Sequence, residues 1–333
     1  MPATLLKIAS LPVAALVWLG SQGTRAIAAL VFIGIAVPPA GELLKPYVTE
    51  AIFLLLCISF LRVDLGTLRS YLQRPGLVMS ATAWTMLAVP LIFGGVCRLT
   101  GLTVGSPDLY LALMLQALAS PMMAAPSLAA VMGLDATLVL VTLVVGTCLV
   151  PITAPLFAYL LLGSALSLSP LALGLKLLAI LAGSLCAGSA IRLIAGLERI
   201  KQHARLIDGI NVVILFVFVA AVMGHVAGGF LADPLRALKL MALAFAVFFA
   251  LMGATALVFR KAGYSRAVAL GLMVSQRNMG LMLAATDGIL PGTTWLYFAM
   301  SQFPIYLTPQ LLKPLVDRLN APQDVIASEA RKT

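Results

Sequence analysis

Long apolar runs separated by short polar joints make up most of the chain. Because a transmembrane helix needs about 20 apolar residues, these runs predict about ten spans. We place them at residues 26–44, 48–64, 76–98, 109–133, 136–162, 170–194, 206–229, 235–260, 267–287 and 294–316. Proline and glycine occur at many of the joints, where a helix must end or bend. The pattern predicts an all-α polytopic membrane protein.

Residues 1–25 form a separate N-terminal segment. Its apolar stretch, Leu11–Gly20, is too short to span a bilayer, and Lys7 precedes it as in a signal peptide. No small-residue cleavage site follows, and a predicted span begins at once. We favour an interfacial or re-entrant helix, with a signal peptide as the alternative.

The number of spans predicts an internal symmetry. Ten spans divide into two sets of five, and an odd number makes the second set cross the membrane in the opposite sense. In such inverted repeats, a binding site forms where interrupted helices of corresponding position meet at the membrane midplane. We expect a first repeat at 26–162, a second at 163–320 and a cytoplasmic tail at 321–333. The fourth and ninth spans correspond, and both are interrupted.

Three consecutive polar residues, Gln276, Arg277 and Asn278, interrupt the ninth span. An arginine at mid-bilayer costs roughly 2.5–3.5 kcal/mol on insertion scales, so its presence suggests a functional site. Its guanidinium is a planar, permanently charged fork that suits an anionic group. A structural interpretation is that the guanidinium satisfies carbonyls exposed by a neighbouring helix break. The two interpretations are compatible.

Two prolines, Pro121 and Pro126, stand near the middle of the fourth span. Each removes a backbone donor and clashes with the preceding turn, and carbonyls freed at that depth need protein, water or ligand as partners. An ordinary proline kink is the alternative, but we favour a broken helix. The polar side chains near the interruptions join Arg277 as candidates for substrate binding. They are Ser127, Ser275, Gln276, Asn278, Ser301 and Gln302.

Composition supports a membrane protein and narrows its function. Hydrophobic residues make up 62% and charged residues 10% of the chain, with a mean hydropathy of +1.07. The net charge of +10 comes from basic clusters between apolar runs, which are topology signals, so nucleic acid is not expected as a partner. With a cytoplasmic N-terminus, sixteen of the 22 Lys and Arg residues face inside and four face outside. We therefore expect both termini in the cytoplasm.

The titratable residues give little support for catalysis. None of the twelve carboxylates falls at mid-membrane, so neither a carboxylate proton relay nor a carboxylate partner for Arg277 is evident. The four cysteines have no paired spacing and are expected to be buried free thiols. Lys176 is expected to snorkel toward the outer face. No enzyme activity, cofactor or metal site is expected.

Three stretches carry a resemblance to a known family. They are FLLLCISFLRVDLGTL at 53–68, ASPMMAAPSLAAVMGLDATLVLVTLVVGTCLVPITAPLFAYLLLG at 119–163 and QRNMGLMLA at 276–284. From about residue 26 to 316 the chain resembles the bile acid:sodium symporter (BASS-like) family, in particular its bacterial sodium-dependent-transporter-like members. The resemblance implies a panel domain and a core domain, with helices four and nine crossing at their breaks. It also implies alternating-access transport of organic anions across the bacterial inner (plasma) membrane.

The chain departs from this family where sodium would bind. Ala125 and Pro126 stand where the family has a Ser-Asn pair, and Val139 and Leu143 stand where it has hydroxyl ligands. Met273 takes the place of the family's glutamate, and Arg277 takes the place of its glutamine. Hard cations need oxygen ligands, and most of these are gone. We hypothesise that Arg277 replaces the bound ion as a tethered charge.

These observations predict a secondary transporter of a small organic anion, most simply a carboxylate, that works without sodium. Its expected partners are this substrate and the lipid bilayer, and sodium is not expected among them. Two alternatives stay open. One is a sodium-coupled symporter with altered ion sites, and the other is a transport-inactive membrane sensor or assembly partner.

Overall fold

The computed structural model describes residues 2–22, 38–62, 75–163, 166, 168–305, 307, 308 and 312. Within these residues the regular structure is helical, without a β-strand. Six helical stretches are long and apolar enough to cross a membrane: Gly41–Leu61, Pro75–Leu99, Ala136–Leu162, Pro170–Ala195, Ala204–Ala232 and Pro234–Val258. The expectation of an all-α chain compatible with a membrane is confirmed for this part. Ten spans and inverted repeats stay predictions, and most of the first span and the tail at 321–333 lie outside the described residues.

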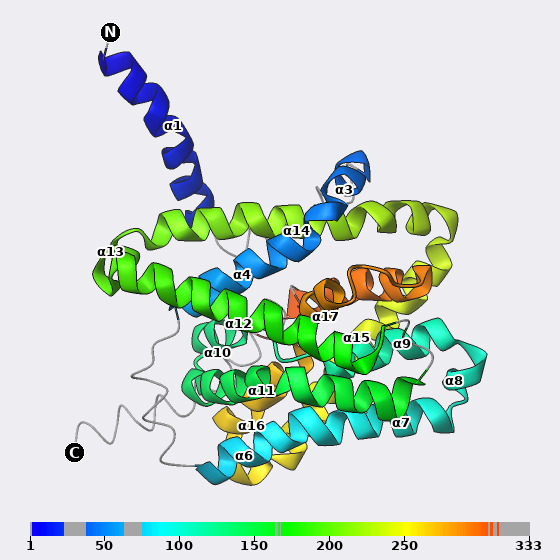
Figure 1. The fold of residues 1–333 in the computed structure, drawn as a ribbon. Helices are drawn as coiled ribbons and strands as arrows, with labels where there is room; N and C mark the ends of the chain where they lie inside the picture. Colours follow the sequence, from blue (N-terminus) through cyan, green and yellow to red (C-terminus); the bar gives the residue numbers. More distant parts are fainter. Residues whose placement is uncertain are drawn as a thin grey trace, which may run out of the picture.

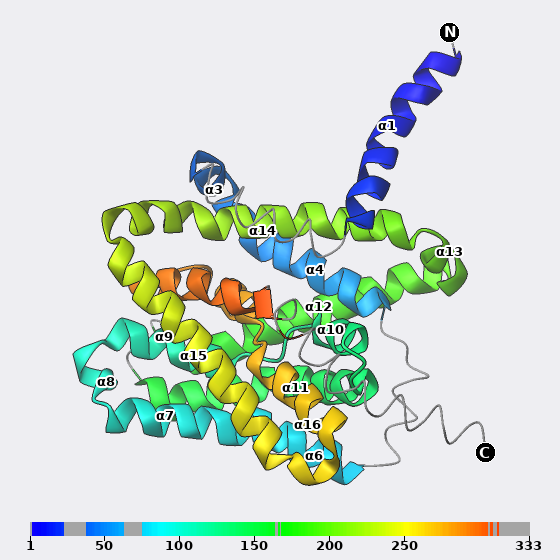
Figure 2. The same cartoon turned by 180° about the vertical axis from the view of Figure 1, so that it is seen from behind.

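A first helix group forms one layer of the molecule (Figures 1 and 2). Its long members, α12 and α14, both pack against α4. The short α3 packs on α14, and α13 connects α12 to α14. The bounds are α3 Pro38–Leu44, η1 Lys45–Tyr47, α4 Val48–Arg62, α12 Pro170–Ala195, α13 Leu197–Gln202 and α14 Ala204–Ala232.

A second helix group lies against the first through contacts of α11 with α12. Within it, α15 packs on α16, and α11 contacts α6, α10 and α16. The bounds are α6 Pro75–Ala83, η2 Trp84–Ala88, α7 Val89–Leu99, α8 Leu102–Gly105, α9 Pro107–Leu118, α10 Ala125–Val131, α11 Ala136–Phe157, η3 Ala158–Leu162, α15 Pro234–Val258, η5 Arg260–Ala262, α16 Tyr264–Ser275 and α17 Met279–Ala285. Residues 292–305 are helical as well.

The long helices run between two ends of the molecule. One end carries α8 and the other carries α13, on the right and left of Figure 1. We call them the α8 end and the α13 end. The α13 end holds basic residues of the cluster that the charge count assigns to the cytoplasm, Arg192, Arg199, Lys201 and Arg205. The α8 end is therefore the expected outer end.

The N-terminal segment is one helix, α1 (Pro2–Ser21). Its last turns pack on the beginning of α14, where a Cβ built on Gly209 would lie 1.9 Å from the carbonyl oxygen of Leu16. The other end of α1 points away from the molecule (Figure 1). An interfacial location of this helix stays a prediction.

Gly271 sets how closely α16 approaches α15. A Cβ built there would lie 2.6 Å from the backbone oxygen of Met252, which cannot move aside without displacing α15. Such close approach of helix backbones through small residues is typical of membrane proteins. Because α16 leads directly into the polar triplet at 276–278, this contact positions the site.

Gly271→Ala is expected to lower the thermal midpoint of the purified protein, because overpacking of this kind costs about 1–3 kcal/mol. Gly253→Ala is the matched control, since a Cβ at Gly253 in α15 meets nothing within 4 Å. The control should leave the midpoint unchanged or raise it, because alanine has a higher helix propensity. Equal midpoints for the two variants, measured by differential scanning fluorimetry, would contradict the argument.

Candidate functional site

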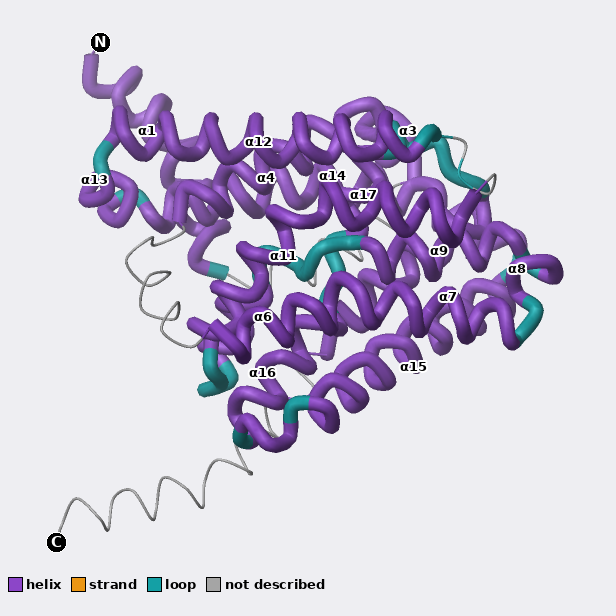
Figure 3. Tube along the Cα trace, turned by 60° about the horizontal axis from the view of Figure 1, so that its bottom comes forward, coloured by secondary structure: helices purple, strands orange, loops and turns teal. Residues whose placement is uncertain are grey.

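Two helix breaks cross near the middle of the molecule. The first separates α9 from α10, and the second separates α16 from α17; Figure 3 shows such loops between helices in teal. Pro121 and Arg277 form an isolated antiparallel bridge. The N–H of Met122 donates to the oxygen of Gln276 at 2.8 Å, and the N–H of Asn278 donates to the oxygen of Ser120 at 2.8 Å. The two broken backbones therefore satisfy part of each other's hydrogen-bonding capacity.

Local sequence explains where each helix stops and restarts. Pro121 lacks the N–H that would continue α9, and Ala119 is already extended with ψ 149°. Pro126 lies in the first turn of α10, where a missing N–H costs nothing. The Asn278 side-chain oxygen accepts from the N–H of Leu281 at 3.2 Å and so caps α17. Pro121 thus lies inside the first break, whereas Pro126 begins the next helix.

The guanidinium of Arg277 joins these breaks to a third backbone irregularity. Its side chain is buried, and Nη1 donates to the oxygen of Ala119 at 2.9 Å. Nη1 and Nη2 also lie 3.4 Å from the oxygen of Thr85, which belongs to the π-helical turn η2. Within η2 the N–H of Val89 donates to the backbone oxygen of Trp84, five residues earlier. In the same register the backbone oxygen of Thr85 would accept from the N–H of residue 90. That residue is Pro90, which has no N–H.

The positive charge of Arg277 has no carboxylate partner among the described residues. Among the same residues, its Nε–H has no acceptor either. A buried charge without a counter-ion is costly, and buried polar groups are otherwise paired with few exceptions. Among the described residues the crossing therefore offers two unused donors, the Arg277 Nε–H and the Ser120 hydroxyl, and an uncompensated positive charge.

A cavity of about 200 Å³ lies beside the crossing. Its walls come from α4, α14, the two breaks and helical residues 292–305. Most of the lining is apolar, from residues Ile52, Leu55, Leu56, Met122, Met123, Ala124, Leu128, Leu215, Phe218, Met279, Gly280 and Ile305. The polar lining residues are Ser59, Asn211, Arg277, Asn278 and Gln302. An apolar cavity with a few convergent polar groups is typical of a small-molecule site.

Three of the predicted site residues line this cavity: Arg277, Asn278 and Gln302. The amide nitrogen of Gln302 donates to the oxygen of Phe298 at 3.2 Å, within its own helix. Asn278 uses its side-chain oxygen as a helix cap. The structure thus places Arg277 and Asn278 of the polar triplet and Gln302 of the tenth predicted span at one cavity.

The other four predicted residues do not line the cavity. The hydroxyls of Ser275 and Ser301 donate to carbonyls one turn earlier, at Leu272 and Phe298. Gln276 is buried, and its amide nitrogen lies 3.4 Å from the oxygen of Ile305. Ser127 is exposed on α10. A role of these four side chains in substrate binding stays a prediction, without support from the cavity lining.

Sequence reasoning missed several groups at the site. Asn211 and Ser59 line the cavity from α14 and α4. Each is a polar residue within an apolar predicted span, and this feature of the sequence could have marked it as a candidate site residue. Thr85 was missed because it contributes its backbone oxygen, although Pro90 within the third predicted span indicated a nearby free carbonyl.

Within the described residues, the cysteines and potential metal ligands do not form a second site. All four cysteines are free, and only Cys57 and Cys97 are buried. Cys148 and Cys186 are exposed on the outer faces of α11 and α12, so the expectation of buried thiols is wrong for these two. The described residues contain no group of three or more His, Cys, Asp or Glu that could hold a metal ion.

Comparison with known proteins leaves the family unassigned. No protein-family model matches the chain, and no curated protein is significantly similar to it in sequence.

The Arg277 contact with Thr85 makes a prediction about a pair of variants. Arg277→Gln should lower the free energy of unfolding by about 1–3 kcal/mol for each carbonyl left unsatisfied. Pro90→Ala restores an N–H that can pair with Thr85, so Arg277→Gln should cost about 1 kcal/mol less in that background. Denaturation of all four proteins in one detergent measures this coupling. Additive effects would show that Arg277 does not serve the Thr85 carbonyl.

Proposed function

We propose that this chain is a secondary transporter of a small organic anion, most simply a carboxylate. The observation that carries the proposal is Arg277, a residue that lines an apolar cavity and whose buried guanidinium has no carboxylate partner among the described residues. An anionic group that reached the unused Nε–H would supply the missing charge and acceptor. Charge-assisted bonds of this kind are among the stronger hydrogen bonds in proteins.

The position of the cavity supports transport over simple binding. It lies between α4 and α14 on one side and the crossing breaks on the other. Crossing interrupted helices at a central site is the arrangement found in transporters with inverted repeats. In our proposal the two helix groups rock around the cavity, as the family resemblance implies.

We further propose that transport does not require sodium. A bound cation at the crossing would use backbone carbonyls, and the carbonyls of Ala119 and Thr85 are already engaged by Arg277. A fixed guanidinium at that point repels a second cation and requires no ion from solution. The loss of the family's oxygen ligands supports the same proposal.

A binding screen followed by a flux measurement tests this function. Organic acids are added to purified protein, and a true ligand raises the thermal midpoint. The ligands found are then tested for uptake and counterflow in proteoliposomes, with sodium replaced by choline at constant ionic strength. We expect flux of at least one carboxylate and equal rates in the two salts. A steep rise with sodium would exclude the uncoupled mechanism, and binding without flux would favour a sensor.

Arg277→Gln is expected to weaken binding of the transported anion about tenfold or more, because a charged hydrogen bond is worth about 1.5–3 kcal/mol. The protein should still insert, since the substitution removes a charge from the bilayer interior. Arg277→Lys is the control that keeps the charge and loses the planar fork. Its affinity for the anion should lie between those of the parent and Arg277→Gln. Unchanged affinity in Arg277→Gln would leave Arg277 a purely structural role.

Asn211→Leu tests the cavity itself. Asn211 lines the cavity from α14, and the similarly sized leucine removes its hydrogen-bonding groups. We expect a lower uptake rate, by about 3- to 30-fold, with little change in the thermal midpoint. Ser127→Ala is the control, because Ser127 is exposed on α10 outside the cavity lining, and its uptake should match the parent. An equal loss in the two variants would argue against this cavity as the site.

A further inference from the structure

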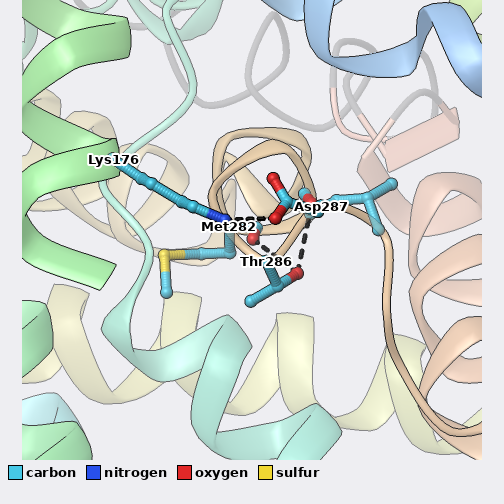
Figure 4. Close-up of polar contacts among 5 residues, drawn as sticks. Lys176, Met282, Thr286 and Asp287 are labelled. Atoms are coloured by element: carbon cyan, nitrogen blue, oxygen red, sulfur yellow. Dashed lines mark hydrogen bonds and ion pairs between the residues drawn. The ribbon is translucent and has the colours of Figure 1, made fainter. Parts of the chain in front are cut away.

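The crossing helix α17 is held at the α8 end by a charged contact. Lys176, from α12 in the first helix group, pairs its Nζ with Oδ2 of Asp287, just beyond the end of α17. Figure 4 shows Lys176 extended toward Asp287, with Thr286 and Met282 beside it. The position of Lys176 near a helix end suggested that it snorkels. Its side chain also links α12 of the first helix group to the turn that follows α17.

The turn that carries Asp287 is built to present this carboxylate. The hydroxyl of Thr286 donates to the oxygens of Met282 and Leu283, one turn back in α17. Asp287 then adopts a left-handed conformation with φ 53°, the one positive φ among the described non-glycine residues. Such a conformation is uncommon outside glycine, asparagine and aspartate, and it is retained where the surroundings fix it.

A second contact joins the same two parts at the same end. The Nε1–H of Trp295, in helical residues 292–305, donates to the oxygen of Gly288 at 3.1 Å. Lys45 Nζ, from η1 of the first helix group, lies 5.6 Å from the centre of the Trp295 ring. Two lysines of the first group thus hold the α17 turn, one directly and one through Trp295.

The cavity lies on the other side of these contacts. Its α14 lining runs from Asn211 to Phe218, the half of that helix nearer the α13 end, and its α4 lining runs from Ile52 to Ser59, the middle of α4. Between the cavity and the Asp287 turn, Leu281, Met282 and Leu283 of α17 are buried. Because α17 contacts α12, a path to the cavity that runs between these two helices from the α8 end requires them to separate.

We propose that the Lys176–Asp287 ion pair is a latch that holds the α8 end closed, and that it opens when the cavity becomes accessible from that end. The purpose of the latch rests on the proposed transport function. The latch itself is tested by accessibility, so that either can fail without the other.

The test uses a single reporter cysteine. Met282→Cys is placed in a protein whose four native cysteines are replaced by serine or alanine, because Met282 is buried beside the latch. The initial rate of labelling by a membrane-impermeant maleimide is measured on right-side-out and inside-out vesicles. The side of greater labelling identifies the side on which the latch opens, which we expect to be the outside.

Lys176→Gln should raise the labelling rate about two- to fivefold, the range expected for loss of a partly exposed ion pair. Asp287→Asn should raise it equally, and asparagine is suited to the left-handed φ. Lys176→Glu places two negative charges together and should raise the labelling rate further. The double variant Lys176→Glu/Asp287→Asn removes this repulsion, so its labelling rate should return to that of the single neutral variants. Lys239→Gln is the control, since Lys239 is an exposed lysine of α15 without a carboxylate partner among the described salt bridges.

Two results would overturn the latch. One is a parental labelling rate in both Lys176→Gln and Asp287→Asn, and the other is an equal rise in Lys239→Gln. The amount of folded protein is checked for each variant by its thermal midpoint. If the thermal midpoint falls in Lys176→Gln alone, the labelling rate of Asp287→Asn still decides the test, because asparagine has the same side-chain shape as aspartate. Raised salt should increase labelling in the parent but not in Lys176→Gln, because salt screens the pair.

Discussion

One guanidinium holds together three interruptions of backbone structure in the apolar interior. Arg277 contacts carbonyls of the break after α9 and of the π-helical turn η2, and it stands itself in the break after α16. In a bilayer, backbone groups that leave a helix find no water and need a protein partner. The crossing of the two broken helices, and with it the cavity, therefore depends on this side chain.

The cost of placing Arg277 in the membrane is offset only in the folded state. Insertion of an arginine at mid-bilayer costs roughly 2.5–3.5 kcal/mol, and a hydrogen bond to a charged group returns about 1.5–3 kcal/mol. The 2.9 Å bond to Ala119 and the longer contacts to Thr85 are together of the same size as the cost. Because Pro90 leaves Thr85 without its usual donor, the proline and the arginine are complementary. Without Arg277, Pro90 would leave the Thr85 carbonyl without a donor.

The sequence was sufficient for the interrupted spans but not for the direction of side chains. Hydropathy located the six long apolar helices of the described residues, because apolar length is a direct requirement of the bilayer. Pro121 and Arg277 departed from the apolar pattern sharply enough to be singled out. The position of Ser127 next to Pro126 in the sequence did not show which way its side chain points, because the backbone of the break determines how α10 is rotated about its axis. Asn211 lay far from either interruption in the chain and joins the site only because α14 packs beside the crossing.

The role of Thr85 illustrates a second limit. In an α-helical register Pro90 would orphan the carbonyl of Met86, and only the π-helical register transfers that loss to Thr85. That choice depends on packing around η2, where the indole Nε1–H of Trp84 donates to Thr255 of α15 at 3.0 Å. A proline in a span therefore indicates that a free carbonyl exists without identifying which one. Its partner is found only when the three-dimensional neighbours are known.

The proposed exchange of a bound ion for a tethered charge also changes how the crossing responds to its surroundings. A diffusible ion stabilises the state that binds it in proportion to the logarithm of its concentration. Such an ion can therefore link the conformation of the crossing to a gradient across the membrane. Arg277 is covalently present at the crossing in every state, so its contribution does not vary with the ions on either side. What remains variable is the anion that balances its charge, and in this mechanism the substrate alone decides which conformation is favoured.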